Sequence, residues 1–188
     1  MTDHRRGVLV TLSGPSGVGK DTLINHLIAS SDFHKFAAYT TRPPRLGETN
    51  GLDYRFITQE QFDALLVGTS FFDHLVVNGF SYGTPWRDFE EVVNSGDKAI
   101  VHLSASAALK LKGGIPSTIA VFVMPPSSKD LISRLRSRGM SDQAIEARLK
   151  EEPTDVRLSL QFDFIVVNHT GEESETAAKI LKFIEAAK

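Results

Sequence analysis

The chain has 188 residues, of which 41% are hydrophobic, which is enough for one α/β domain with a proper core but not for two independent domains. Its formal net charge is −2 at pH 7, so nucleic-acid or acidic-membrane binding is not expected, because such partners select a strongly basic face. The absence of cysteine excludes a disulfide framework and a Cys-based zinc site. The start has no apolar signal core, and no apolar run approaches the ~18 residues that span a bilayer, so we expect a soluble cytoplasmic protein.

A glycine-rich segment with the sequence SGPSGVGKDT occupies residues 13–22, directly after an apolar run. Its glycines allow backbone N–H groups to turn inward around a polyphosphate, and Lys20 supplies a mobile cation for the β and γ phosphates. The usual pattern has Ser or Thr directly after the lysine to hold Mg²⁺, whereas here Asp21 takes that place and Thr22 follows. The segment predicts a nucleotide phosphate-binding loop formed by Gly14, Pro15, Ser16, Gly17, Val18, Gly19, Lys20, Asp21 and Thr22.

Strand-like and helix-like segments alternate along much of the chain, which predicts an α/β fold with a parallel sheet and helices on both faces. The strand-like runs are apolar without alternation, as expected for strands that are buried on both sides. The expected strands are 8–12, 98–103, 118–123 and 164–167, and the helices that follow them are 22–29, 105–111, 128–138 and 174–187.

Two segments interrupt this alternation. Residues 37–94 are rich in Thr, Arg, Gly and aromatic side chains and predict an inserted subdomain. Residues 139–157 predict a lid, with a helix that should end or kink at Pro153 because proline cannot donate the helical hydrogen bond. The sequence therefore predicts one domain, whose core comprises about 1–36, 95–138 and 158–188.

Two arginines, Arg42 and Arg45, lie three residues apart in the insertion on a loop that two prolines stiffen. Guanidinium forks match phosphate oxygens, and the hydroxyls of Tyr54 and Tyr82 would add neutral donors. The pattern therefore suits a phosphomonoester dianion. A solvated surface loop is the other interpretation of the two arginines.

Several segments together resemble the guanylate kinase family over nearly the whole chain: the loop at 14–20, YTTRPPRLGETNGLDYRF at 39–56, NGFSYGTP at 78–85, RLRSRG at 134–139 and VVN at 166–168. The resemblance implies a P-loop kinase fold and phosphoryl transfer from ATP, with Mg²⁺, to a small phosphorylated acceptor. It also implies that Arg42, Arg45, Tyr54 and Tyr82 hold the acceptor phosphate, that Arg138 and Arg148 reach the transferring group from the lid, and that Arg134 and Asn168 lie against adenine. The expected catalytic cations are Lys20, Arg42, Arg138 and Arg148.

The positions that would read the guanine base depart from the family pattern. Ala38 stands where a Ser is expected, Asp73 where a Glu is expected, and His102 and Ser104 where two Asp are expected, while Thr84 keeps its hydroxyl. Losing one charged hydrogen bond costs about 1.5–3 kcal/mol, so guanine selection could weaken by roughly a hundredfold. A changed acceptor and a compensated drift within the family both fit. The acceptor site is expected to include Asp73, Thr84 and Ser104 beside the phosphate ligands.

Asp21 could hold the metal through water, and a Gly-Lys-Asp loop also resembles that of ribose 1,5-bisphosphate kinase, whose acceptor carries no base. The favoured function is ATP-dependent phosphorylation of GMP to GDP. The alternatives are a ribose 1,5-bisphosphate kinase, a nucleotide kinase of altered base specificity and, less favoured, a non-catalytic protein-binding domain. The sequence indicates neither an oligomeric state nor a pathway.

Overall fold

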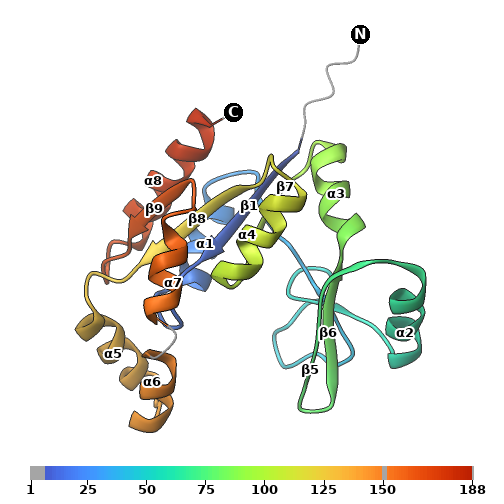
Figure 1. Cartoon of the computed structure of the whole chain (residues 1–188), viewed down its shortest axis with the longest axis horizontal. Helices are drawn as coiled ribbons and strands as arrows, with labels where there is room; N and C mark the ends of the chain where they lie inside the picture. The colour runs from blue at the N-terminus through green and yellow to red at the C-terminus, as the bar shows by residue number, and fades with distance from the viewer. Residues whose placement is uncertain (1–6, 150–151, 188) are drawn as a thin grey trace. The chain divides into compact units, whose positions relative to one another are not determined.

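A computed structural model describes residues 7–149 and 152–187 (Figure 1). Contacts divide the chain into two compact units. The first, here called the insertion unit, comprises Met1–Leu9 and Phe33–Val101, and the second, here called the loop unit, comprises Val10–Asp32 and His102–Lys188. Two of the boundaries between the units fall within strands β1 and β7, and the third falls between Asp32 and Phe33. Each unit is described by itself.

The sheet of the loop unit consists of parallel strands with β8 in the middle: β1 (Val8–Ser13), β8 (Ile119–Met124) and β9 (Phe164–Val167). Val10 pairs with Ile119 across β1 and β8, and Phe122 pairs with Ile165 across β8 and β9. Nearly every side chain of β8 is buried, because helices cover both faces and both alternating rows of side chains face a packed layer.

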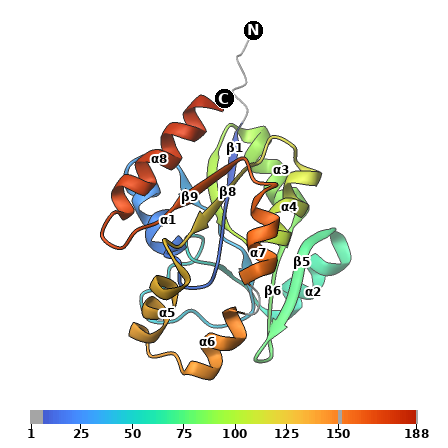
Figure 2. The same cartoon turned by 60° about the vertical axis from the view of Figure 1, so that its left-hand side comes forward.

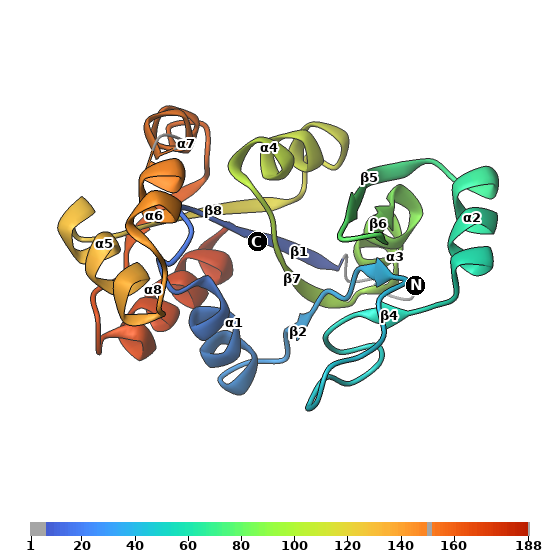
Figure 3. The same ribbon diagram turned by 90° about the horizontal axis from the view of Figure 1, so that it is seen from below.

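Helices pack on opposite faces of this sheet (Figure 3). One face carries α1 (Lys20–Ala29) and α8 (Glu173–Ala186), which also contact one another, and the other carries α4 (Ala105–Gly114) and α7 (Glu152–Ser159). Helices α5 (Ser128–Ser137) and α6 (Asp142–Leu149) lie side by side and bury Leu131, Leu135 and Ile145 between them (Figure 2).

The insertion unit holds an antiparallel-rich sheet with the strand order β4-β3-β6-β5. Helix α2 (Gln59–Gly68) and helix α3 (Trp86–Ser95) both contact β6, and Phe62, Phe72 and Phe89 are fully buried among them. In addition, β2 (His34–Lys35) pairs in parallel with β7 (Lys98–His102). The strands of the four-stranded sheet are β3 (Tyr39–Thr40), β4 (Arg55–Phe56), β5 (Phe71–Val77) and β6 (Phe80–Pro85).

The predicted α/β class and the alternation of buried strands with helices are confirmed, with element ends that differ from the expected ones by at most three residues. The expected end or kink of the helix at Pro153 stays a prediction, because residues 150–151 lie outside the described ranges. Helix α6 is described as far as Leu149, and Pro153 lies in the first turn of α7, where a missing N–H removes no helical hydrogen bond. The core, insertion and lid boundaries stay predictions. Among the helices in the described ranges, none combines the length and the apolar composition that crossing a bilayer requires.

Candidate functional site

The predicted phosphate loop turns through three glycines with positive φ, at 137° for Gly14, 91° for Gly17 and 102° for Gly19. A Cβ atom on Gly14 would lie 2.2 Å from the carbonyl oxygen of Val123, so the loop passes against β8 where no side chain fits. Gly19 is the N-cap of α1, which places the N-terminus of this helix beside the loop. Backbone N–H groups and the positive end of a helix dipole therefore meet here, as anion binding requires.

The amine of Lys20 is folded into this loop. Its Nζ atom donates hydrogen bonds to the carbonyl oxygens of Gly14, at 2.6 Å, and Pro15, at 2.9 Å, and the residue is only 7% exposed. The adjoining pocket has a volume of about 290 Å³ and is bordered by the loop, by the segment 102–104 and by Arg138. This pocket is called the loop pocket below. A polyphosphate that enters it would meet a cation already held at its base.

Asp21 lies at the edge of the loop pocket, where its Oδ1 atom is 3.8 Å from Nδ1 of His102. The Asp21 side chain is 79% exposed, so its carboxylate oxygens are accessible to a hydrated cation. Within the described residues there is no cluster of three or more His, Cys, Asp or Glu side chains that could hold a metal alone. A single carboxylate beside a phosphate pocket nevertheless fits Mg²⁺, which is commonly bound by one or two carboxylates plus substrate phosphates.

Arg134 and Asn168 meet at the back of the loop. Arg134 donates from Nη1 to the carbonyl oxygen of Val18, from Nη2 to that of Asn168 and from Nε to the Thr170 hydroxyl, at 2.8, 2.7 and 3.1 Å. The Asn168 amide donates to the same Val18 oxygen at 2.9 Å. We call this arrangement the Val18 clasp.

Beside the clasp lies a second pocket of about 170 Å³, which Arg134, Asn168 and Thr22 help to line. Arg138 borders both this pocket and the loop pocket. The structure thus brings Arg134, Asn168 and Arg138 to the phosphate loop, while their predicted roles toward adenine and the transferring group stay predictions. The side chain of Arg148, on α6, lies outside the described part of the structure.

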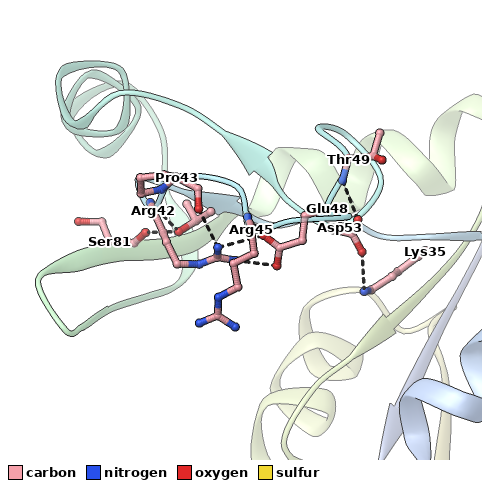
Figure 4. Close-up of polar contacts among 9 residues, drawn as sticks. Lys35, Arg42, Pro43, Arg45, Glu48, Thr49, Asp53 and Ser81 are labelled. Carbon is pink, nitrogen blue, oxygen red and sulfur yellow. Dashed lines mark hydrogen bonds and ion pairs between the residues drawn. The ribbon is translucent and has the colours of Figure 1, made fainter.

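In the insertion unit, Arg42 and Glu48 form a two-pronged ion pair (Figure 4). The hydrogen bond to Glu48 raises the pKa of Arg42, and the same contact, followed by the backbone N–H of Arg45, lowers the pKa of Glu48. The Arg45 side chain extends away from this pair in Figure 4 and forms no ion pair with a described residue. Of the two predicted phosphate ligands, therefore, Arg42 is anchored and Arg45 is exposed.

A pocket of about 380 Å³ in the insertion unit is bordered by Tyr54, Tyr82, Asp73 and Ala38. The rings of Tyr54 and Tyr82 meet edge to face at a centroid distance of 5.9 Å. We call it the insertion pocket. Burial raises the pKa of Tyr54, so this hydroxyl stays a neutral donor. Tyr54, Tyr82 and Asp73, all predicted acceptor ligands, thus border one cavity.

Four predicted acceptor residues do not border the insertion pocket: Arg42 and Arg45, whose contacts are described above, and Thr84 and Ser104. Thr84 pairs with Asp73 across β5 and β6 but is buried. Ser104 belongs to the loop unit, where it borders the loop pocket and its hydroxyl accepts the N–H of Ala107 as the N-cap of α4. The hydroxyl of Ser104 is therefore already engaged in holding a helix end. The acceptor roles of all four residues stay predictions.

Sequence reasoning missed Glu48 and the contact between Asp21 and His102. A signal for Glu48 existed, because a carboxylate three residues after Arg45 and six after Arg42 on one loop can reach either arginine. No signal for the second contact lay in either segment alone, because residues 21 and 102 meet only through the fold of the loop unit.

Comparison with known proteins matches the guanylate kinase family model to residues 6–187. The chain belongs to the guanylate kinase family. It is 33% identical to the guanylate kinase of Neisseria gonorrhoeae, covering 93% of this chain and 86% of the relative, and 36% identical to that of Koribacter versatilis, covering 96% and 78%. A crystal structure of guanylate kinase from Anaplasma phagocytophilum matches with a TM-score of 0.70 at 29% identity, covering 97% of this chain and 86% of that one.

Membership of the guanylate kinase family agrees with the arrangement of the pockets. The loop pocket lies wholly within the loop unit, and the insertion pocket lies wholly within the insertion unit. Lys20 and Arg138 border the loop pocket, and Tyr54, Tyr82 and Asp73 border the insertion pocket. This is what a nucleoside monophosphate kinase needs for each of its two substrates.

Proposed function

We propose that the protein transfers the γ-phosphoryl group of ATP to GMP and releases ADP and GDP. The observation that carries this proposal is the intact phosphate loop with the Lys20 amine held inside it, in a chain that matches the guanylate kinase family over 6–187. A family member that had lost catalysis would have no need of a buried lysine at this point, because a buried cation is costly unless it is paired.

The loop unit is the proposed ATP site. The inward-facing N–H groups of the loop bind the phosphates, and Lys20 exchanges its two carbonyl partners for β- and γ-phosphate oxygens. Arg138 borders both pockets of this unit, so its guanidinium can contact the nucleotide phosphates and the transferring phosphoryl group. Arg134 and Asn168 line the smaller pocket, which is assigned to the adenine side. Arg148 would join Arg138 from the lid.

The insertion unit is the proposed acceptor site. Arg42, Arg45, Tyr54 and Tyr82 bind the monophosphate, and Asp73 accepts hydrogen bonds from the base. An oxygen of the acceptor phosphate attacks Pγ in line, and the bond from Pγ to the bridging oxygen of ADP breaks. No general base is needed, because the acceptor phosphate is already largely anionic near pH 7. The protein contributes position and positive charge.

The exposed carboxylate of Asp21 at the edge of the loop pocket fits a magnesium ion, which Asp21 would hold through water beside the ATP phosphates. When bound, Mg²⁺ neutralises charge on the phosphate oxygens. Asp21 itself needs that neutralisation, since without it the carboxylate would repel a triphosphate. The lid, expected at 139–157, is proposed to close over the substrates and exclude water that would hydrolyse ATP. The proposed site of action is the cytoplasm.

One specific observation favours a second candidate acceptor. The insertion pocket is bordered by Ala38 and Asp73, where the family pattern has Ser and Glu. In addition, the Gly-Lys-Asp sequence that ends at Asp21 resembles the phosphate loop of ribose 1,5-bisphosphate kinase. A base-free acceptor would need the phosphate ligands but not a complete base-reading set. The test is ADP release measured with GMP, dGMP, AMP, UMP, CMP and ribose 1,5-bisphosphate in turn, each with ATP and Mg²⁺. GMP is expected to give the highest kcat/KM, and a preference for ribose 1,5-bisphosphate would overturn this assignment.

A non-catalytic protein-binding role would leave the chain unable to hold ATP. Calorimetric titration with ATP and Mg²⁺ separates the two cases before any turnover is measured. We expect saturable binding that Lys20→Ala weakens. A flat titration of the unaltered protein would instead support the binding-domain alternative.

A further inference from the structure

Glu48 occupies one defined edge of the Arg42 guanidinium. Its Oε1 atom lies 2.9 Å from Nη2, and its Oε2 atom lies 2.9 Å from Nη1. The carbonyl oxygen of Pro43 accepts a third hydrogen bond from Nη1 at 2.7 Å. A guanidinium has five N–H donors, so the contacts with Glu48 and Pro43 leave Nε–H and one Nη2–H, and the neighbouring Tyr82 hydroxyl also hydrogen-bonds this guanidinium. Those two donors lie along a single edge and form a second fork, of the kind that matches a phosphate.

The same carboxylate also fixes the backbone of the other arginine. Oε2 of Glu48 accepts the backbone N–H of Arg45 at 2.6 Å, and the backbone N–H of Glu48 donates to the Arg45 carbonyl at 3.0 Å. Gly47 makes this tight turn possible with a φ of 89° in open space. One side chain therefore binds the guanidinium of Arg42 and sets the chain direction at Arg45.

The remaining surroundings of Arg42 restrict its side chain further. The guanidinium lies 5.6 Å from the centroid of the Tyr54 ring and 5.7 Å from that of Phe56. Its side chain is only 10% exposed, and the Tyr82 hydroxyl is close enough to contribute to its raised pKa. Arg42 is thus held on one edge by Glu48 and on its face by aromatic rings.

We propose that Glu48 is a positioning residue for the acceptor phosphate, and this rests on the proposed function. It does not touch the acceptor. It holds Arg42 in one rotamer so that the Nε and Nη2 fork is preorganised for the phosphate dianion, and it holds the turn from which Arg45 projects. Preorganisation lowers the entropy lost when a phosphate binds. The competing interpretation is that Glu48 occupies the phosphate position itself and leaves when the acceptor arrives.

The two interpretations predict opposite signs for Glu48→Gln, which keeps the side-chain length and one acceptor oxygen but loses the charge and the fork. If Glu48 positions Arg42, the KM for GMP rises about tenfold, as for loss of one charged hydrogen bond, while the KM for ATP stays within about twofold. If Glu48 competes with phosphate, the KM for GMP falls. Unchanged KM values would leave Glu48 with a role in folding only. A lower KM for GMP or an unchanged KM would each overturn the proposal.

Asp53→Asn is the matched control. Asp53 belongs to the same loop and accepts the backbone N–H of Thr49 at 2.9 Å, yet its charged partner is Lys35 rather than an arginine of the pair (Figure 4). The Asn side chain, like Gln at position 48, still offers one acceptor oxygen to the backbone. We expect a change of less than about twofold in the KM for GMP, because an exposed ion pair contributes little.

A double-mutant cycle tests whether Glu48 acts through Arg42. Glu48→Gln is measured in the unaltered chain and in an Arg42→Lys background, where no guanidinium fork exists to be positioned. The effect on the KM for GMP should be much smaller in the second background. Equal effects in both backgrounds would contradict a role through Arg42.

A final measurement separates failure of this proposal from failure of the proposed function. NMR of the arginine Nε–H groups, with inorganic phosphate as the probe, needs no turnover and no nucleotide. A sharp, protected Arg42 signal that shifts with phosphate, and that broadens in Glu48→Gln, supports positioning whatever the acceptor is. If this result holds but GMP is not phosphorylated, the proposed function is wrong and the positioning role of Glu48 is still supported. An Arg42 signal that is identical in Glu48→Gln would overturn the positioning role.

Discussion

The Nζ atom of Lys20 lies 2.6 Å from the carbonyl oxygen of Gly14 in the same loop that it is proposed to serve. The amine therefore pairs its charge with backbone carbonyl groups, which phosphate oxygens are proposed to replace. This relationship ties the conformation of the loop to the side chain that completes it.

Lys20→Ala is expected to lower kcat by about 100-fold or more, because the cation that stabilises developing phosphate charge is lost. Steady-state ADP release with GMP measures this. Lys179→Ala, which removes an exposed lysine on α8, is the control and should leave kcat unchanged. Near-normal turnover in Lys20→Ala would refute the assigned role.

Gly19→Ala is expected to damage the loop itself. The new Cβ would lie 2.7 Å from Nδ2 of Asn168, at a backbone φ of 102°. A strained backbone of this kind costs about 1–3 kcal/mol, to be read from urea unfolding, and ATP binding should weaken with it. Gly113→Ala is the matched control, because no atom lies within 4 Å of the added methyl group in helix α4, and a small gain in stability of about 0.5–1 kcal/mol is expected there. Equal unfolding midpoints for the two variants would contradict the steric argument.

Asn168→Ala removes one of the two side-chain donors that share the Val18 carbonyl. Asn168 is 0% exposed, so we expect a loss of stability of about 1–3 kcal/mol and a higher KM for ATP with little change for GMP. Denaturant unfolding and initial rates at varied ATP report the two effects. Asn94→Ala on the exposed side of α3 is the comparison variant. An increase in the KM for GMP alone would contradict a role for Asn168 in binding ATP.

Asp73→Ala tests base recognition in the insertion pocket. Loss of the carboxylate is expected to lower kcat/KM for GMP by about 10- to 100-fold, the equivalent of one charged hydrogen bond. Ribose 1,5-bisphosphate has no base, so any turnover of it should be unaffected. Asp63→Ala removes a carboxylate on α2 whose hydrogen-bond partner is Gln59, and serves as the control. An equal loss for both acceptors would mean that Asp73 supports the pocket rather than reading the base.

The Arg42–Glu48 pair should make the free energy of unfolding depend on pH in the acidic range. Because the pKa of Glu48 is below its ordinary value of 4.5 in the folded chain, its contribution to stability is fully present above about pH 4.5 and is lost as the pH falls through the lowered pKa. Urea unfolding of the unaltered chain and of Glu48→Gln, from pH 7 to pH 3, should show curves that converge at low pH. Curves that stay parallel over this range would show that Glu48 has an ordinary pKa.

Much of the loop unit follows from local sequence signals. The glycine spacing dictates the turn before α1, and the uninterrupted apolar run of β8 requires burial on both faces, so neither feature depends on distant residues. The ends of elements were less predictable, as α4 illustrates: it was expected to end at residue 111 but continues to Gly114. Glycine is a weak helix former, yet the backbone N–H of Ile115 still donates to the carbonyl oxygen of Leu111, so residue type alone does not fix the end.

The side-chain contacts of the candidate site were mostly beyond prediction. The arginines and tyrosines could be assigned to phosphate from their chemistry, but the turn at Gly47 decides that Glu48 returns to Arg42. Likewise, Ser104 had the chemistry of an acceptor ligand, yet the N–H of Ala107 at the start of α4 engages its hydroxyl. A local hydrogen bond of this kind competes with a ligand, and residue type alone does not reveal it.

Because the loop pocket and the insertion pocket are each assembled from residues of one unit, neither substrate is required to build the binding place of the other. Such an enzyme should accept its two substrates in either order. Initial-rate plots would then intersect, product inhibition would be competitive within each pair of nucleotides, and no phosphorylated intermediate of the protein would accumulate.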